Sequence, residues 1–206
     1  WAEESVNKTM QKLIGDEKDY VIAIDTDSLY INFGPLVKKF NPKNPVAWLD
    51  QICKEHFEPK IADSYKELFD SFQCARPRME MGREVIADVG IWTAKKRYIL
   101  NVHNSEGVQY AEPKLKIMGI EAVKSSTPAP CRTMIKDALK LMMTGSEEDV
   151  IDFIDAAKKK FRNMPPEDIA FPRSISDVAK HKSHATIYGK GCPIHVRGAL
   201  LYNFYI

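Results

Sequence analysis

Two short apolar runs that flank one polar step stand out early in the chain. Residues 20–24 and 29–33 are rich in Val, Ile, Tyr and Phe, the residue types that favour β-strands. The step between them, Asp25-Thr-Asp-Ser28, is short and polar, as a tight connection requires. The pattern therefore predicts a β-hairpin with two acids at its tip.

Apolar positions around this hairpin recur every three to four residues, which indicates helices that bury one face. One helix is predicted over residues 1–14, and Gly15 ends it. Another is predicted over 46–56, with Asn44 as its N-cap. Pro59 is expected to bend or divide the helical pattern that continues beyond it.

From Arg78 onward the period of the apolar positions shortens to two. Residues 79–89 and 91–102 predict two strands that are joined near Gly90. A third strand is expected after the turn cluster at 104–107. This part of the chain should therefore form a sheet of its own.

Helical periodicity returns near residue 127, where we expect a domain boundary. One helix is predicted over 129–143, and Ser146 caps a second one. A final β segment is expected in the apolar run 200–206, after a turn at 189–191. The apolar residues predicted to form the buried face of the second helix are Val150, Phe153, Ile154, Ala157 and Phe161. The predicted fold class is α+β.

Composition and charge exclude several classes of protein. The formal net charge is +2, so any face that binds nucleic acid must be local. The four cysteines form no C-x-x-C pair, which favours a reduced intracellular protein over a disulfide scaffold or zinc site. No run resembles a membrane span or a signal peptide. The chain begins with Trp1 and ends in an apolar run, which predicts a fragment of a longer polypeptide.

The acids at the hairpin tip, Asp25 and Asp27, are one residue apart and should point to the same side. Their charges would repel each other near a dry core, and a divalent cation would relieve that repulsion. Oxygen ligands from paired carboxylates suit Mg²⁺ or Mn²⁺, which also favour substrate phosphates. The same residues are typical of a polar turn that caps a hairpin, so both interpretations are open.

The segment Lys95-Lys96-Arg97-Tyr98, predicted to lie within an apolar strand, is a second candidate. Strand alternation puts Lys96 and Tyr98 on one face, and Lys95 and Arg97 on the other. Residues 90–132 contain seven Lys or Arg and three Glu, a local excess of +4. A cation beside a tyrosine hydroxyl suits the backbone and sugar of a nucleic acid. A solvated edge strand protected by lysines is the alternative.

In this order, these segments resemble the family B DNA polymerases of large tailed phages. Asp25-Thr-Asp-Ser-Leu-Tyr30 is similar to their third palm motif, and Lys95-Lys-Arg-Tyr98 to their K-K-R-Y element. The stretch 113–128 resembles the link from palm to thumb, and 192–202 resembles a thumb segment. Ala23-Ile24 departs from the Tyr-Gly that usually precedes the Asp, which affects how the chain approaches the turn.

The resemblance implies an antiparallel palm sheet backed by helices, followed by part of a mainly helical thumb. Residues 1–126 would be the later half of the palm, and 127–206 the beginning of the thumb. The implied activity is template-directed DNA synthesis by two-metal nucleotidyl transfer, with Mg²⁺ or Mn²⁺. In the catalytic site, Asp27 would be the main metal ligand, and Asp25 would be the neighbouring carboxylate with a share in binding the metal.

The resemblance also implies a set of DNA contacts. Lys96 and Tyr98 would hold the primer end, and Lys95 and Arg97 would support them or contact the duplex. The other implied DNA-binding residues are Lys114, Lys116 and Gly119 along the nascent duplex, and Arg197 in the thumb.

Several parts of such an enzyme have no counterpart in this sequence: the first palm motif, the fingers motif and the exonuclease carboxylates. The implied partners are primer–template DNA, a dNTP and the missing half that carries exonuclease and fingers, with a sliding clamp in the full enzyme. The implied place of action is the cytoplasm of an infected host cell, without a membrane. We expect the chain to be inactive without its missing half.

Four other interpretations use single features of the sequence. A haloacid-dehalogenase-type phosphatase would use Asp25 as nucleophile and Asp27 as general acid, but it leaves the basic segment unexplained. A non-catalytic DNA-binding module would use acids and bases for binding only. An EF-hand loop from Asp25 fails, because its sixth position is Tyr30 instead of glycine. His181 and His184 offer half of a metal site, and no second pair accompanies them.

Overall fold

The computed structural model divides the chain into two compact units, Trp1–Ile120 and Glu121–Ile206. The residues that the structure describes are 1–76, 78–181, 183 and 191–205. The units divide at the end of the last strand. Their assignment to palm and thumb stays a prediction.

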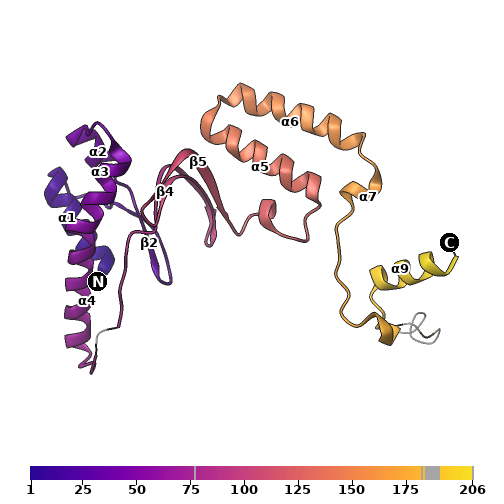
Figure 1. The fold of residues 1–206 in the computed structure, drawn as a ribbon, viewed down its shortest axis with the longest axis horizontal. Coiled ribbons are helices and arrows are strands. Elements are labelled where there is room, and N and C mark those ends of the chain that lie inside the picture. The colour runs from indigo at the N-terminus through magenta and orange to yellow at the C-terminus, as the bar shows by residue number, and fades with distance from the viewer. Residues whose placement is uncertain (77, 182, 184–190, 206) are drawn as a thin grey trace. The chain divides into compact units, whose positions relative to one another are not determined.

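The first unit combines helices with two antiparallel sheets, so the predicted α+β fold class is confirmed. Its helices gather on one side, and its strands lie together beside them (Figure 1). In chain order the elements are α1 (Ala2–Ile14), β1 (Val21–Asp25), β2 (Ser28–Ile31), α2 (Gly34–Phe40), α3 (Pro45–Ile52), the π-helical turn η1 (Cys53–Phe57), α4 (Glu58–Ser71), β3 (Val85–Ala94), β4 (Arg97–Ser105) and β5 (Val108–Met118).

The first predicted helix is confirmed as α1. Val6 and Met10 lie one turn apart and are both fully buried. Gly15 ends the helix in a left-handed conformation with φ 89°, which glycine adopts without a steric penalty. The buried residues of the core that α1 joins are Val6, Met10, Tyr20, Leu36, Phe57, Ile61 and Tyr65. This core holds the helices against the β1–β2 hairpin.

The second predicted helix is confirmed in outline, and the structure shows how the helical pattern is divided. The Asn44 side chain accepts a hydrogen bond from the Ala47 N–H at 3.2 Å, as an N-cap should. The helix then widens into η1 and restarts as α4, with Pro59 in the first turn. A proline fits there because its missing N–H would have no partner in a first turn. The helix α2 was not predicted.

The prediction of two strands joined near Gly90 is wrong, because β3 runs straight through this glycine. The turn to β4 lies at Lys95 and Lys96 instead. A Cβ atom at Gly90 would lie 2.6 Å from the Trp92 ring and 2.9 Å from a Leu100 methyl group. The glycine therefore marks close packing within the sheet instead of a turn.

The two sheets of the first unit are separate but in contact. The strands β1 and β2 pair antiparallel, and the second sheet has the order β3-β4-β5 with both pairs antiparallel. Tyr30 of β2 packs edge-on against Trp92 and Tyr98, with ring centroids 5.4 and 5.2 Å apart. These aromatic contacts fix the hairpin on one face of the larger sheet.

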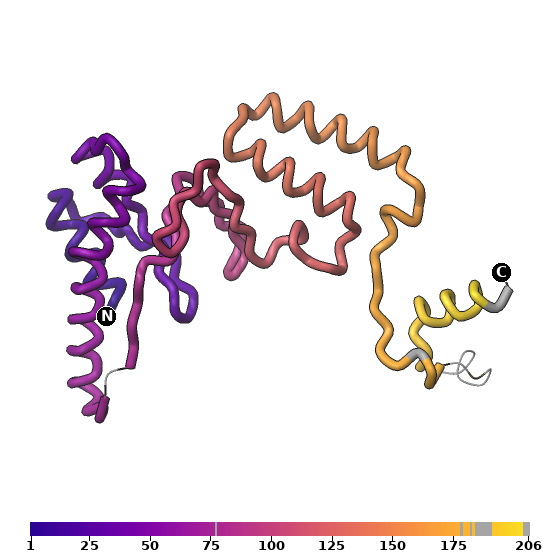
Figure 2. Tube along the Cα trace, viewed as in Figure 1, coloured from indigo at the N-terminus to yellow at the C-terminus, as the bar shows by residue number. Residues whose placement is uncertain are grey.

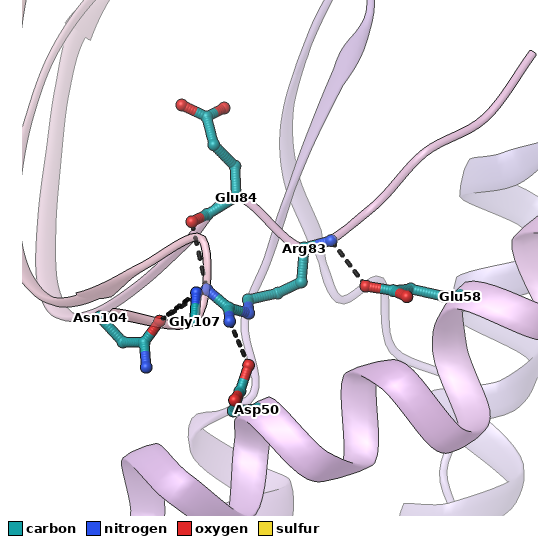
Figure 3. Close-up of polar contacts among 6 residues, drawn as sticks. All are labelled: Asp50, Glu58, Arg83, Glu84, Asn104 and Gly107. Carbon is teal, nitrogen blue, oxygen red and sulfur yellow. Dashed lines mark hydrogen bonds and ion pairs between the residues drawn. The ribbon is translucent and has the colours of Figure 1, made fainter. Parts of the chain in front are cut away.

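Arg83 connects the helices of the first unit with its larger sheet (Figure 3). Its guanidinium forms an ion pair with Asp50 of α3 and donates from Nη1 to Asn104 Oδ1 of β4 at 2.8 Å. Its backbone N–H donates to Glu58 Oε1 of α4 at 2.8 Å. Asn104 Oδ1 also accepts from the N–H of Gly107, at 3.1 Å. Arg83 thus joins α3 and β4 through its guanidinium and α4 through its backbone N–H, and Asn104 extends the contact to the Gly107 turn.

The second unit is mainly helical, and its α5 and α6 form an antiparallel hairpin (Figure 2). Ser146 and Asp149 form the predicted capping box, with Ser146 Oγ accepting from the Asp149 N–H at 3.2 Å. Its elements are η2 (Glu121–Val123), α5 (Ala129–Thr144), α6 (Glu147–Arg162), α7 (Pro166–Ile169), η3 (Val178–His181) and α9 (Ile194–Tyr205). Among the described residues, no helix is both long and apolar enough to cross a membrane.

Two predictions for the second unit are wrong. The predicted apolar face of α6 is not buried: Ile154 and Phe161 are 43% and 39% exposed, although α6 packs against α5. The predicted final β segment is the helix α9, because a short apolar run has no periodicity that separates strand from helix. His184 and residues 189–190 of the predicted turn lie outside the described residues. Gly191, the last residue of that turn, is described.

We predict that Arg83→Ala lowers the free energy of unfolding of this chain by about 3 kcal/mol, because breaking a buried pair leaves its partner uncompensated. The Arg83 side chain is only 8% exposed. Urea denaturation followed by circular dichroism measures the change. Lys66→Ala is the matched control, since its pair with Asp63 is exposed and should contribute less than about 1 kcal/mol. Equal effects of the two variants would contradict the prediction.

Candidate functional site

The polar step between β1 and β2 is a two-residue turn made by Thr26 and Asp27. Thr26 has a left-handed backbone, with φ 49°. The Asp27 N–H donates to the Asp25 carbonyl oxygen at 2.6 Å, and Ser28 Oγ donates to the same oxygen at 3.0 Å. The turn is therefore held by its own polar residues, and both acids stand at its rim.

The departure at Ala23-Ile24 leaves the hairpin intact. Ala23 pairs with Tyr30 and Ile24 with Leu29 in a regular antiparallel register. An irregularity of the pairing lies earlier, between Val21 and Ala23. The β-branched side chain of Ile24 is accommodated because it is 50% exposed.

Lys96 meets Asp25 across the two sheets. Its Nζ lies 2.8 Å from Asp25 Oδ1, and the side chains are 61% and 23% exposed. The prediction that Lys95 and Lys96 lie inside a strand is wrong, since both occupy the β3–β4 turn and Lys96 has φ 60°. The direction of the Lys96 side chain is therefore set by the turn and not by strand alternation.

The ion pair changes the charge balance at the hairpin tip. The hydrogen bond from Lys96 lowers the pKa of the Asp25 carboxyl, more than desolvation raises it. The same hydrogen bond raises the pKa of Lys96. Asp25 is thus ionised and compensated, while Asp27 is exposed and has no ion-pair partner among the described residues.

Tyr98 lies beside this pair but inside the fold. It is 5% exposed and packs against Tyr30 and Trp92. Burial, and then a hydrogen bond with Tyr30, raise the pKa of Tyr98, so its hydroxyl is protonated near neutral pH. Its predicted contact with a primer stays a prediction.

The other predicted DNA-binding residues are in different surroundings. Lys114 lies over the Tyr110 ring, 4.2 Å from its centroid, and Lys116 forms an ion pair with Glu84. The remaining ones are Lys95, which is exposed, Arg97 at the start of β4, Gly119 just after β5, and Arg197 in α9 of the second unit. The first unit thus brings Lys96, Tyr98 and the two acids together and carries Lys114 and Lys116 on the far strand of the same sheet.

A cavity of about 1000 Å³ in the first unit has Asp27 among its lining residues. Most of its wall is apolar and comes from β2, α2, α3 and β3, which is an edge strand. No pattern in the sequence predicted this cavity. It borders Asp27, the acid of the turn that does not form the ion pair with Lys96.

The cavity also borders a polar pair that sequence analysis missed. His103 Nε2 lies 3.1 Å from Asp88 Oδ2, and Asn101 donates to Asp88 Oδ1 at 2.9 Å. Burial acts to raise the pKa of Asp88, but the combined effect of His103, Asn101 and the Val89 N–H lowers it. Only the register of β3 against β4 could have revealed this pair.

Comparison with known proteins identifies the relatives of this chain. No protein-family model matches it. The DNA-directed DNA polymerase of Escherichia phage RB69 is 36% identical, and that of Enterobacteria phage T4 is 33% identical, each over 218 aligned residues. Each alignment covers 98% of this chain. The chain is a relative of the phage DNA-directed DNA polymerases.

The resemblance inferred from the motifs is thereby confirmed. The chain spans only 24% of the length of these phage polymerases, so their names describe much longer enzymes. The similarity extends over 98% of the chain and is not confined to the two motif segments. The role of each residue stays a prediction.

We predict that Lys96→Met raises the pKa of the Asp25 carboxyl toward its usual value, since the largest cause of the lowering is lost. A lowered carboxyl pKa stabilises the fold above the unfolded-state pKa, and this contribution disappears as the pH falls through the folded-state pKa. NMR titration of the Asp25 carboxyl carbon measures the shift. Lys95→Met is the control and should shift it less. An unchanged pKa in Lys96→Met would contradict the ion pair.

Proposed function

We propose that this chain supplies one side of the active site of a phage-type DNA polymerase. The observation that supports this best is the ion pair between Lys96 Nζ and Asp25 Oδ1, at 2.8 Å. Its two partners belong to the two segments on which the polymerase resemblance rests most firmly. Residues far apart in the sequence therefore converge on one acidic and basic site.

The two acids of the turn would have different tasks. Lys96 compensates the charge of Asp25, so Asp25 would position the Lys96 ammonium instead of binding a metal by itself. Asp27 keeps its carboxylate oxygens open to solvent and to the cavity. We therefore assign the metal-ligand role to Asp27.

The donors of the turn fit Mg²⁺ or Mn²⁺ in kind, because carboxylate oxygens are their preferred protein ligands. They do not complete a site: the described residues contain no group of three or more His, Cys, Asp or Glu that could hold a metal ion. The other ligands would come from the missing half of the enzyme and from the dNTP. When bound, such ions would activate the primer 3′-hydroxyl and neutralise the triphosphate.

The β3–β4 turn would face the primer–template. Lys95 and Lys96 are exposed there, next to Arg97. These cations would attract phosphates without reading sequence. Lys114 and Lys116 would extend the basic surface only in part, because each already contacts Tyr110 or Glu84.

The missing half of the polymerase, with its exonuclease and fingers, would dock on the first unit. The cavity has a mostly apolar wall, which a docked partner would cover. It lies along β2, which belongs to a sheet of two strands, and along the edge strand β3. Two-stranded sheets are marginal by themselves and gain from further pairing. The full enzyme would bind a sliding clamp and would act in the cytoplasm of the infected cell.

Both relatives are DNA polymerases, which disfavours the phosphatase alternative. A non-catalytic DNA-binding module is the remaining alternative. Such a module would also use the basic β3–β4 turn to bind DNA, but Asp27 would have no chemical role in it. The activity of a reconstituted enzyme separates the two.

We predict that the chain binds duplex DNA without sequence preference and that binding weakens steeply with salt. Lys96→Ala should lower the affinity and flatten the salt slope by about one unit, as loss of one phosphate contact does. Fluorescence anisotropy across a salt series measures both quantities. The exposed Lys66 of α4 provides the control variant Lys66→Ala. Equal affinity of Lys96→Ala and the unmodified chain would remove Lys96 from the DNA-binding face.

We predict that the chain alone incorporates no nucleotide and that an upstream polypeptide with the first palm motif and fingers restores primer extension. Loss of one side of the metal site removes several kcal/mol of transition-state stabilisation, at about 1.4 kcal/mol per tenfold in rate. Asp27→Asn should abolish the restored activity and leave DNA binding nearly intact.

Extension of a labelled primer by each half, by both, and by both with the variant measures this. Asp63→Asn, an exposed acid of α4, is the matched control and should keep full activity. Synthesis by this chain alone would refute the divided site. Full activity of the Asp27→Asn mixture would exclude Asp27 as the metal ligand.

A further inference from the structure

The end of β5 touches the turn that carries Lys96. Gly119 follows β5 with φ 67°, and Lys96 itself has φ 60°. A Cβ atom at Gly119 would collide with the Lys96 carbonyl oxygen and lie 3.1 Å from Arg97 Cγ. The obstacle is a backbone atom, which cannot rotate away as a side chain can. The absence of a side chain at Gly119 is therefore a condition for this conformation of the turn.

The same turn sets the direction of the Lys96 side chain. Tyr98 pairs with Met118, so the register of β4 and β5 places Gly119 against the turn. A left-handed conformation is unusual for lysine and needs support from its surroundings. Gly119 is the neighbour that allows this conformation, and Lys96 then reaches Asp25 at 2.8 Å.

We infer that Gly119 is a positioning residue, which lets the β3–β4 turn adopt the form that directs the Lys96 ammonium to the Asp25 carboxylate. The resemblance implied only that Gly119 lies along duplex DNA. Here it acts through Lys96, without a contact to the nucleic acid. The inference rests on the proposed function only where DNA binding is the readout.

A cross-linking experiment on the free chain tests the geometry without DNA. A water-soluble carbodiimide joins an ammonium group to an adjacent carboxylate as an amide and takes up the water as a urea. Peptide mass spectrometry of the unmodified chain should show the Lys96–Asp25 link. In Gly119→Ala this link should fall several-fold relative to the link between Lys8 and Glu4 of α1, which are 2.7 Å apart.

Gly107→Ala is the matched control. Gly107 also has a positive φ, 86°, but a Cβ atom there would meet nothing within 4 Å. Backbone strain alone should therefore leave the Lys96–Asp25 link unchanged. Loss of the Lys8–Glu4 reference would reveal a variant that does not fold. In that case Gly119→Asn replaces it, because asparagine tolerates positive φ and introduces the same Cβ atom.

An unchanged Lys96–Asp25 link in a folded Gly119→Ala or Gly119→Asn chain would overturn the inference.

A double-mutant cycle on DNA affinity is a second test of the inference. If Gly119 acts through Lys96, adding Gly119→Ala to Lys96→Ala should cause no further loss of affinity. If Gly119→Ala lowers the DNA affinity of the Lys96→Ala chain as much as it lowers that of the unmodified chain, the positioning role is overturned. If the chain bound no DNA at all, the proposed function would fail and the cross-link would still decide the inference.

Discussion

The buried guanidinium of Arg83 joins the two layers on which the first unit is built. It pairs with Asp50 on the helical side and with Asn104 on the sheet side, and its backbone N–H is held by Glu58. A buried cation without partners would be very unfavourable, so these groups must all be in place together. The helices and the sheet are therefore locked in one arrangement, and β3 starts from a fixed point.

The site depends on this arrangement because its parts come from both sheets. The hairpin that carries Asp25 is held on the helical core through β1 and β2, and Tyr30 packs on the sheet against Trp92 and Tyr98. Lys96 lies close to these two rings, in the turn between β3 and β4. Packing of the aromatic rings thus brings an acid and a base together that no local rule connects.

Electrostatics distinguish two acids that look alike in the sequence. An ammonium group at 2.8 Å compensates Asp25 and lowers its pKa, whereas Asp27 stands outside that pair and lines the cavity. Two adjacent carboxylates would otherwise raise each other's pKa and weaken any metal site. A lysine from a distant turn therefore compensates one of the two carboxylates and leaves the other without an ion pair among the described residues.

Local patterns in the sequence determined those parts of this protein whose causes are local. The helix stop at Gly15, the cap at Asn44 and the capping box at Ser146 each depend on a few neighbouring residues, and all were predicted. The hairpin around Asp25 and the resemblance to phage polymerases also came from short motifs.

Tertiary structure alone decided the rest. The sequence pointed to a turn at Gly90, and only contact with Trp92 and Leu100 explains why that glycine lies in a strand. The pairing of Lys96 with Asp25 and its dependence on Gly119 arise from strand register and close approach of two backbones. Such contacts join residues that are distant in sequence, so their energies appear only once the chain is folded.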